Sequence, residues 1–271
     1  MSNNPLVITC ALIGAELTRE DTPYLCLTPD ELAQSAQMAV KAGACIIHLH
    51  VRDEQGMPSQ RTDIFKEVSE KIKARCDCIL QYSTGGAVGT PLAQRCAPLK
   101  LKPEMATLSM GTMNFGPDIF ENPEETIKTI ADTIKKNSIM PELEIFDLGM
   151  LDTTFRYMKK GLIPERFHIN FVLGVPGGLS GDIRNLVILV DRLKSNQTWS
   201  VAGIGRFQLP LAIHALAMGG HVRVGFEDNI YYHKEELAKS NPQLIDRIIR
   251  IAREFGRPIA TVKQTRRILG L

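Results

Sequence analysis

Two histidines separated by a single residue offer the clearest chemistry in this sequence. His48 and His50 end the apolar run at residues 44–50. In a β-strand, side chains two positions apart point to the same face, so the two imidazoles would lie side by side. A short apolar run is typical of a buried parallel strand, and two imidazoles at its end can bind a borderline metal such as zinc. The alternative is a pair of core histidines whose nitrogens are satisfied by backbone carbonyls.

A second group of ionisable residues stands near the other end of the chain. In an extended segment Arg223 and Glu227 would share one face, and the opposite face would be apolar: Val222, Val224 and Phe226. Glu227 would then be a third metal ligand beside the two histidines. Two imidazoles and one carboxylate leave a coordination position open, as catalytic zinc sites do.

Asp228 is the candidate general base. A neighbouring guanidinium favours the ionised form of a carboxylate and orients it, so Arg223 would hold Asp228 ready to accept a proton. The alternative is that Glu227 and Asp228 only begin a helix, where acidic residues are common. A guanidinium on the inward face of a buried strand needs a carboxylate or an anionic ligand, which favours a functional site.

These residues can meet only if their strands end at one rim. Eight short apolar segments alternate with helical patterns, at residues 6–12, 45–50, 79–83, 105–109, 143–147, 168–173, 198–204 and 222–226. The length of 271 residues is close to the ~250 residues typical of a (β/α)8 barrel. We therefore predict a single α/β domain over residues 1–271, a (β/α)8 TIM barrel with its site at the carboxyl ends of the strands.

Three of the predicted helices begin with a pattern typical of a capping box. Thr28 precedes Glu31 by three residues, and residues 122–125 and 261–264 repeat the arrangement. In this motif the first side chain accepts from the backbone of the fourth residue, whose own side chain reaches back.

Other polar residues at strand ends would face the same rim. Ser83, Thr84 and Gly85 offer hydroxyl and backbone N–H groups that could bind an anion. The remaining candidates are hydroxyls and carboxylates on or just after strands: Glu16, Thr107, Ser109, Glu142 and Glu144. Glycine clusters at 174–178 and 203–206 would let a large ligand approach, although turn formation alone also explains them. Together these features indicate an anionic substrate and a phosphate-bearing partner.

Composition narrows the class of protein. Hydrophobic residues make up 44% and charged residues 23%, with a net charge of +2 and both signs interleaved. We expect no nucleic-acid partner and no membrane association. The start of the sequence has no pattern of a signal peptide, so we expect a cytoplasmic protein with reduced cysteines. The gap between Cys76 and Cys78 is shorter than in the usual metal or redox pair.

With these residues identified, the chain resembles the β-keto acid cleavage enzymes. The similar stretches follow one another along nearly the whole chain, at residues 47–52, 83–89, 101–107, 171–178, 202–206 and 225–229. The resemblance implies a zinc-dependent TIM barrel, usually a homotetramer, that converts a β-keto acid and acetyl-CoA into acetoacetate and a new acyl-CoA.

The resemblance also implies roles for the residues named above. The metal ligands would be His48, His50 and Glu227, and the base would be Asp228 with Arg223. Ser83 would stabilise an oxyanion, and the substrate contacts would be Glu16, Thr84, Gly85, Thr107, Ser109 and Glu144. The chain is most similar to members that act on 3-keto-5-aminohexanoate in lysine fermentation, and the acidic pair Glu16 and Glu144 would suit its ammonium group. The implied reaction is a Claisen addition to acetyl-CoA followed by a retro-Claisen cleavage.

Four alternatives remain. The same chemistry could act on a different β-keto acid. A metal-dependent amidohydrolase also uses a His-x-His strand, but it needs histidines at later strand ends, whereas His168 stands at the start of its strand. A class II aldolase would work without CoA. A structural metal site would normally have a fourth protein ligand, often cysteine.

Overall fold

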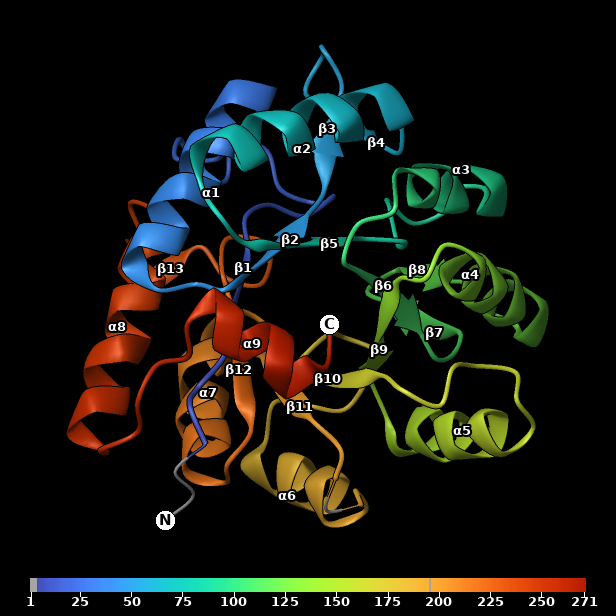
Figure 1. Ribbon diagram of the computed structural model, residues 1–271. Coiled ribbons are helices and arrows are strands. Elements are labelled where there is room, and N and C mark those ends of the chain that lie inside the picture. The colour runs from blue at the N-terminus through green and yellow to red at the C-terminus, as the bar shows by residue number, and fades with distance from the viewer. Residues whose placement is uncertain (1–3, 195) are drawn as a thin grey trace.

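Eight parallel strands close into a barrel surrounded by helices (Figure 1). The computed structural model describes residues 4–194 and 196–271. The strand order around the barrel is β1-β12-β11-β10-β9-β6-β5-β2. The barrel strands are β1 (Ile8–Ala11), β2 (Ile46–Leu49), β5 (Ile79–Tyr82), β6 (Met105–Ser109), β9 (Met140–Ile145), β10 (His168–Leu173), β11 (Trp199–Gly203) and β12 (His221–Val224). This architecture confirms the predicted (β/α)8 TIM barrel.

Helices follow the strands, and short hairpins extend the rim after β2, β6 and β12. The helices are α1 (Pro29–Ala42), α2 (Thr62–Arg75), α3 (Leu92–Cys96), α4 (Glu124–Lys136), α5 (Leu148–Lys159), α6 (Ile183–Asp191), α7 (Gln208–Ala217), α8 (Asn241–Glu254) and α9 (Val262–Leu269). The hairpins are β3 (Val51–Arg52) with β4 (Pro58–Ser59), β7 (Met113–Phe115) with β8 (Asp118–Phe120), and β13 (Tyr231–His233) with β14 (Glu236–Leu237). Within the described chain, no helix combines the length and the hydrophobicity that crossing a bilayer requires.

The capping predictions hold for two helices and fail for one. Thr28 and Thr261 both form complete capping boxes. Helix α4 has no side-chain cap, because the side-chain oxygen of Asn122 accepts a hydrogen bond from Nη2 of Arg95 at 2.6 Å. The guanidinium of Arg95 is buried and must find acceptors, so it takes the one that would have capped the helix.

The fifth barrel strand differs from its predicted bounds. It runs from Met140 to Ile145 instead of 143–147, and it pairs with β6 from Met140 onward. Pro141 and Glu142 interrupt the apolar pattern, so the sequence hid the first half of the strand. Asp147 lies beyond its end and caps α5, accepting from the backbone N–H of Met150 at 2.8 Å.

The barrel interior is apolar at the bottom and polar above. The floor consists of residues at the starts of strands, packed against Leu269 of α9: Val7, Ile46, Ile79, Met105 and Met140. Figure 1 shows α9 lying across this end of the barrel. The next inward positions carry polar groups such as His48, Gln81 and Glu142, all nearly inaccessible to solvent. The hydrophobic floor therefore closes the barrel, and the other rim is left for the site.

Gly225 lets the chain turn from β12 toward the rim. Its φ is +148°, and a Cβ atom at this position would lie 2.1 Å from the backbone oxygen of Ala11. No other residue type fits this close approach. The turn at Gly225 lies between Arg223 in β12 and Glu227 after this strand.

We predict that Gly225→Ala lowers the free energy of unfolding by at least about 3 kcal/mol, because backbone strain and overpacking add. The matched control is Gly89→Ala. Gly89 has φ +82° but nothing within 4 Å of a built Cβ, so only the backbone cost of about 1 kcal/mol applies. Urea unfolding measures both variants, and equal losses would contradict the steric argument.

Candidate metal centre and active site

Two histidines and a glutamate from opposite ends of the chain converge at the barrel mouth. His48 lies in β2, His50 follows it, and Glu227 comes after β12. The Nε2 atom of His48 lies 3.3 Å from Oε2 of Glu227, and Nε2 of His50 lies 3.6 Å from Oε1. One ligand atom from each of the three residues lies within 4.8 Å of the others. The structure thus brings together the three residues predicted as metal ligands.

The donor atoms suit a divalent cation. Nε2 of His48 and Oε2 of Glu227 are buried, and neither has a hydrogen-bond partner among the described residues. Nδ1 of His48 lies 2.7 Å from the side-chain oxygen of Gln81, which can only accept. The Nδ1 atom therefore carries the proton, and the lone pair of Nε2 faces the carboxylate. Two imidazole nitrogens and a carboxylate oxygen form a donor set used by catalytic zinc.

The electrostatics of His48 also favour a bound cation. Burial lowers the pKa of His48, but the carboxylates of Glu227 and Glu144 together raise it above its ordinary value. The negative charge that attracts a proton to this nitrogen would also attract a metal cation.

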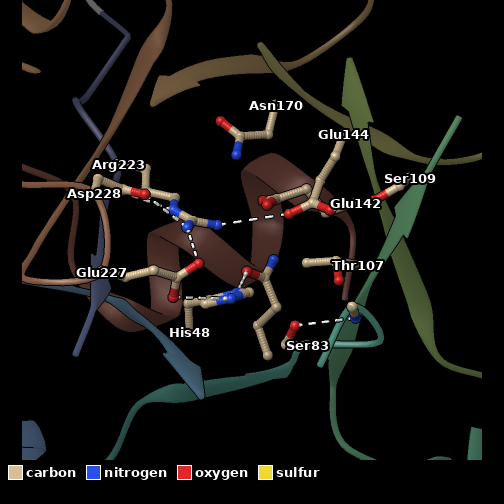
Figure 2. Close-up of polar contacts among 12 residues, drawn as sticks. His48, Ser83, Thr107, Ser109, Glu142, Glu144, Asn170, Arg223, Glu227 and Asp228 are labelled. Atoms are coloured by element: carbon tan, nitrogen blue, oxygen red, sulfur yellow. Dashed lines mark hydrogen bonds and ion pairs between the residues drawn. The ribbon is translucent and has the colours of Figure 1, made fainter. Parts of the chain in front are cut away.

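One buried guanidinium binds three carboxylates (Figure 2). Arg223 donates to Asp228 through Nε at 3.0 Å and through Nη2 at 2.8 Å. Its Nη2 also donates to Glu227, and its Nη1 lies 3.7 Å from Oε1 of Glu144. The two-point contact fixes the plane and position of the Asp228 carboxylate.

The two neighbouring acids have different proton affinities. Burial raises the pKa of Asp228, although Arg223 opposes the shift. Burial also acts on Glu227, but there Arg223, His48 and His50 prevail and hold its pKa well below the usual range. The guanidinium therefore orients Asp228, but its lowering of the pKa is outweighed by burial, so the net shift is opposite to the one predicted from the sequence. A buried carboxylate with a raised pKa is a better base than an exposed one.

The predicted substrate residues fall into two groups. Glu16, Ser83, Gly85 and Glu144 line a cavity of about 500 Å³ together with His50, Arg223, Glu227 and Asp228. Ser83 accepts a hydrogen bond from the backbone N–H of Gly85 at 3.2 Å, which leaves its own hydroxyl proton free to be donated. Glu16 is exposed at the mouth of this cavity.

Thr84, Thr107 and Ser109 do not line the cavity. The backbone N–H of Thr84 donates to Oγ1 of Thr107 at 3.1 Å, and Oγ1 of Thr84 donates to the backbone oxygen of Thr107 at 2.8 Å. Ser109 donates to Glu144 at 2.7 Å. These three hydroxyls are therefore used to hold the rim and Glu144 in place.

Sequence reasoning missed most of the cavity wall. The missed part is largely apolar and includes Leu17, Phe115, Phe120 and Phe146. Val175 and Ile204 also line the cavity, and they belong to the glycine clusters at 174–178 and 203–206 that were expected to admit a large ligand. Phe115 and Phe120 lie on the hairpin β7–β8, and no motif marked them because aromatic residues in a rim hairpin look like ordinary packing. Asp21 was also missed and lines the same cavity.

Comparison with known proteins places the chain in a family. The family model described as beta-keto acid cleavage enzyme matches residues 5–271. The chain is 49% identical over 268 residues to a 3-keto-5-aminohexanoate cleavage enzyme of Fusobacterium nucleatum, with 98% of each chain covered. It is 47% identical to the protein of the same name from Acetoanaerobium sticklandii, again with 98% of each covered. A 3-oxoadipate:acetyl-CoA acetyltransferase of Cupriavidus necator is 38% identical, with 98% of this chain and 95% of that protein covered.

Solved structures agree on the fold. The ternary complex of ObcA with a C4-CoA adduct and oxalate superimposes with a TM-score of 0.82 at 21% identity, covering 92% of this chain and 68% of that one. The motifs, the barrel and the full-length matches agree, and the chain belongs to the beta-keto acid cleavage enzyme family.

Proposed function

We propose that the protein is a zinc-dependent enzyme that cleaves 3-keto-5-aminohexanoate, with acetyl-CoA as co-substrate, to give acetoacetate and 3-aminobutyryl-CoA. The observation that carries this proposal is the convergence of His48, His50 and Glu227 with the Arg223–Asp228 pair at one cavity, which all of them line except the fully buried His48. The names of the relatives at 49% and 47% identity supply the substrate.

The side chains around the cavity have different roles in the proposed reaction. His48, His50 and Glu227 would hold a zinc ion, which when bound supplies a Lewis acid for the ketone of a β-keto acid. Asp228, held by Arg223, accepts the proton from the carbon between the ketone and the carboxylate. The resulting carbanion attacks the thioester carbon of acetyl-CoA. The Ser83 hydroxyl donates to the oxyanion formed there. The adduct expels the CoA thiolate, which adds to the former ketone carbon of the substrate. Retro-Claisen cleavage between that carbon and the deprotonated carbon releases 3-aminobutyryl-CoA, and Asp228 returns its proton to the carbanion to give acetoacetate.

The ends of the substrate meet different surroundings. The apolar wall contacts its carbon chain, and the exposed carboxylate of Glu16 at the mouth can pair with its ammonium group. Glu144 is already paired with Arg223 and Ser109, so it contributes mainly through Arg223. A screen of β-keto acids with acetyl-CoA, read by mass spectrometry of the acyl-CoA products, tests the proposal. We expect 3-aminobutyryl-CoA as the main product, and preference for a β-keto acid that lacks the ammonium group would contradict the proposal.

We also propose that the enzyme is a homotetramer in the cytoplasm. Exposed aliphatic side chains on neighbouring helices support a subunit contact: Val187 and Ile188 on α6 and Ile213 on α7. Sedimentation of the purified protein tests the assembly.

For the metal centre, we predict that His50→Ala reduces zinc binding by more than the roughly 10–100-fold expected for loss of an outer-shell partner. His233→Ala is the control, because His233 is exposed in the hairpin β13–β14. Metal analysis after dialysis measures the ion per chain, and equal metal content in both variants would contradict the ligand assignment.

For the base, we predict that Asp228→Asn keeps its metal and loses at least about 100-fold in kcat, the lower limit for losing a general base. The amide keeps the size of the side chain but cannot accept the proton. Turnover near that of the wild type would remove Asp228 from this role.

For substrate recognition, we predict that Glu16→Gln raises KM for 3-keto-5-aminohexanoate by up to about fivefold, as expected for an exposed ion pair. KM for 3-ketohexanoate, which lacks the ammonium group, should not change. Equal effects on the two substrates would show that Glu16 does not recognise the charge.

A further inference from the structure

Glu142 is a buried carboxylate that the proposed reaction does not use. It lies on β9 inside the barrel and is 1% exposed. Among the described residues, neither of its oxygens has a hydrogen-bond partner of ordinary geometry. Burial raises its pKa to about 6, so it is still ionised at neutral pH. Holding such a charge in the interior is costly, and a side chain of this kind needs a specific reason.

His168 lies near Glu142 but does not neutralise its charge. Nε2 of His168 lies 4.0 Å from the carboxylate, but it is engaged with the Ser200 hydroxyl at 3.0 Å. Burial lowers the pKa of His168 to about 3, so the ring is uncharged. Figure 2 shows Glu142 beside Glu144 on the side of the site that faces Arg223. Arg223, however, directs its hydrogen bonds to Asp228 and Glu227.

The Gln81 amide connects Glu142 with the metal ligand His48. His48 and Gln81 are register partners on the adjacent strands β2 and β5, and their side chains meet at 2.7 Å. Gln81 is fully buried, and its Nε2 has no hydrogen-bond partner of ordinary geometry among the described groups. Gln81 and Glu142 lie on β5 and β9, the two strands that flank β6, and in a TIM barrel alternate strands contribute side chains to one interior layer. The interaction between the amide and the carboxylate also lowers the pKa of Glu142.

The orientation of this amide decides the state of His48. With its oxygen toward His48, the amide accepts from Nδ1–H and leaves the Nε2 lone pair for a metal. With its nitrogen toward His48, the amide would donate to Nδ1, and a neutral ring would then carry its proton on Nε2, where it would block the metal. A carboxylate near the other end of the amide attracts the NH2 group and therefore selects the first orientation.

We propose that Glu142, acting through Gln81, holds His48 in the tautomer that binds the metal, so that both are positioning residues of the metal centre. This inference rests on the proposed metal site but not on the proposed substrate. The proposed role explains why a charged side chain is buried at Glu142, which packing alone does not explain.

Binding of Co²⁺ to the metal-free protein at pH 8 tests the inference, followed by visible absorption and by competition with a chelator. Glu142→Gln and Gln81→Met should each weaken Co²⁺ binding by about 10–100-fold and shift the absorption bands. The double variant should bind no more weakly than the weaker single variant, because the two residues act in one chain. Gln81→Met adds no buried polar group, so it carries the test if Glu142→Gln does not fold.

Ser200→Ala is the matched control, because Ser200 lies in the same buried layer and bonds to His168 and Asn170 instead of Gln81. Its Co²⁺ affinity should equal that of the wild type. Metal-free Glu142→Gln should melt no lower than the wild type at pH 8, since it removes a buried charge.

Three outcomes would overturn the inference: unchanged Co²⁺ affinity in either single variant, additive losses in the double variant, or a similar loss in Ser200→Ala. If the wild type itself binds no Co²⁺, the proposed metal site fails and this inference fails with it. If the wild type binds the ion and the variants bind it equally well, only the inference about Glu142 fails.

Discussion

The site depends on a single buried cation. Arg223 brings Asp228, Glu227 and Glu144 together in a space where three carboxylates would otherwise repel one another. Removing this guanidinium would leave several uncompensated negative charges at the barrel mouth, which is among the most destabilising changes a buried ion cluster can suffer. The same contact positions Glu227 beside the histidines and fixes the Asp228 carboxylate next to them. Metal binding and proton transfer are thus organised by one side chain.

The features that the sequence predicted well are those with local rules or a fixed topology. The two-residue period of a strand placed His48 and His50 on one face. The parallel barrel then required the ends of distant strands to meet, which brought Glu227 and Asp228 to the histidines. Membership of the family followed from motifs spread along the chain, and full-length matches confirm it.

The features that the sequence did not predict depend on which neighbour a polar group meets. Thr84 and Thr107 stand at strand ends as contact residues would, yet they bond to each other. Asn122 has the position of a helix cap but serves the buried guanidinium of Arg95. The raised pKa of Asp228 comes from its burial, which the charge pattern could not reveal. In each case the partner comes from a segment far away, so no local pattern specifies it.

The central claim is that two imidazoles and a late glutamate bind the same divalent ion beside the Arg223–Asp228 pair. Anomalous diffraction from crystals of the zinc-loaded protein, recorded on both sides of the zinc absorption edge, tests this most directly. The account predicts one zinc peak at the barrel mouth, with nitrogens of His48 and His50 and an oxygen of Glu227 at about 2.0–2.2 Å. A zinc peak elsewhere, or one at the mouth from which Glu227 is turned away, would contradict it.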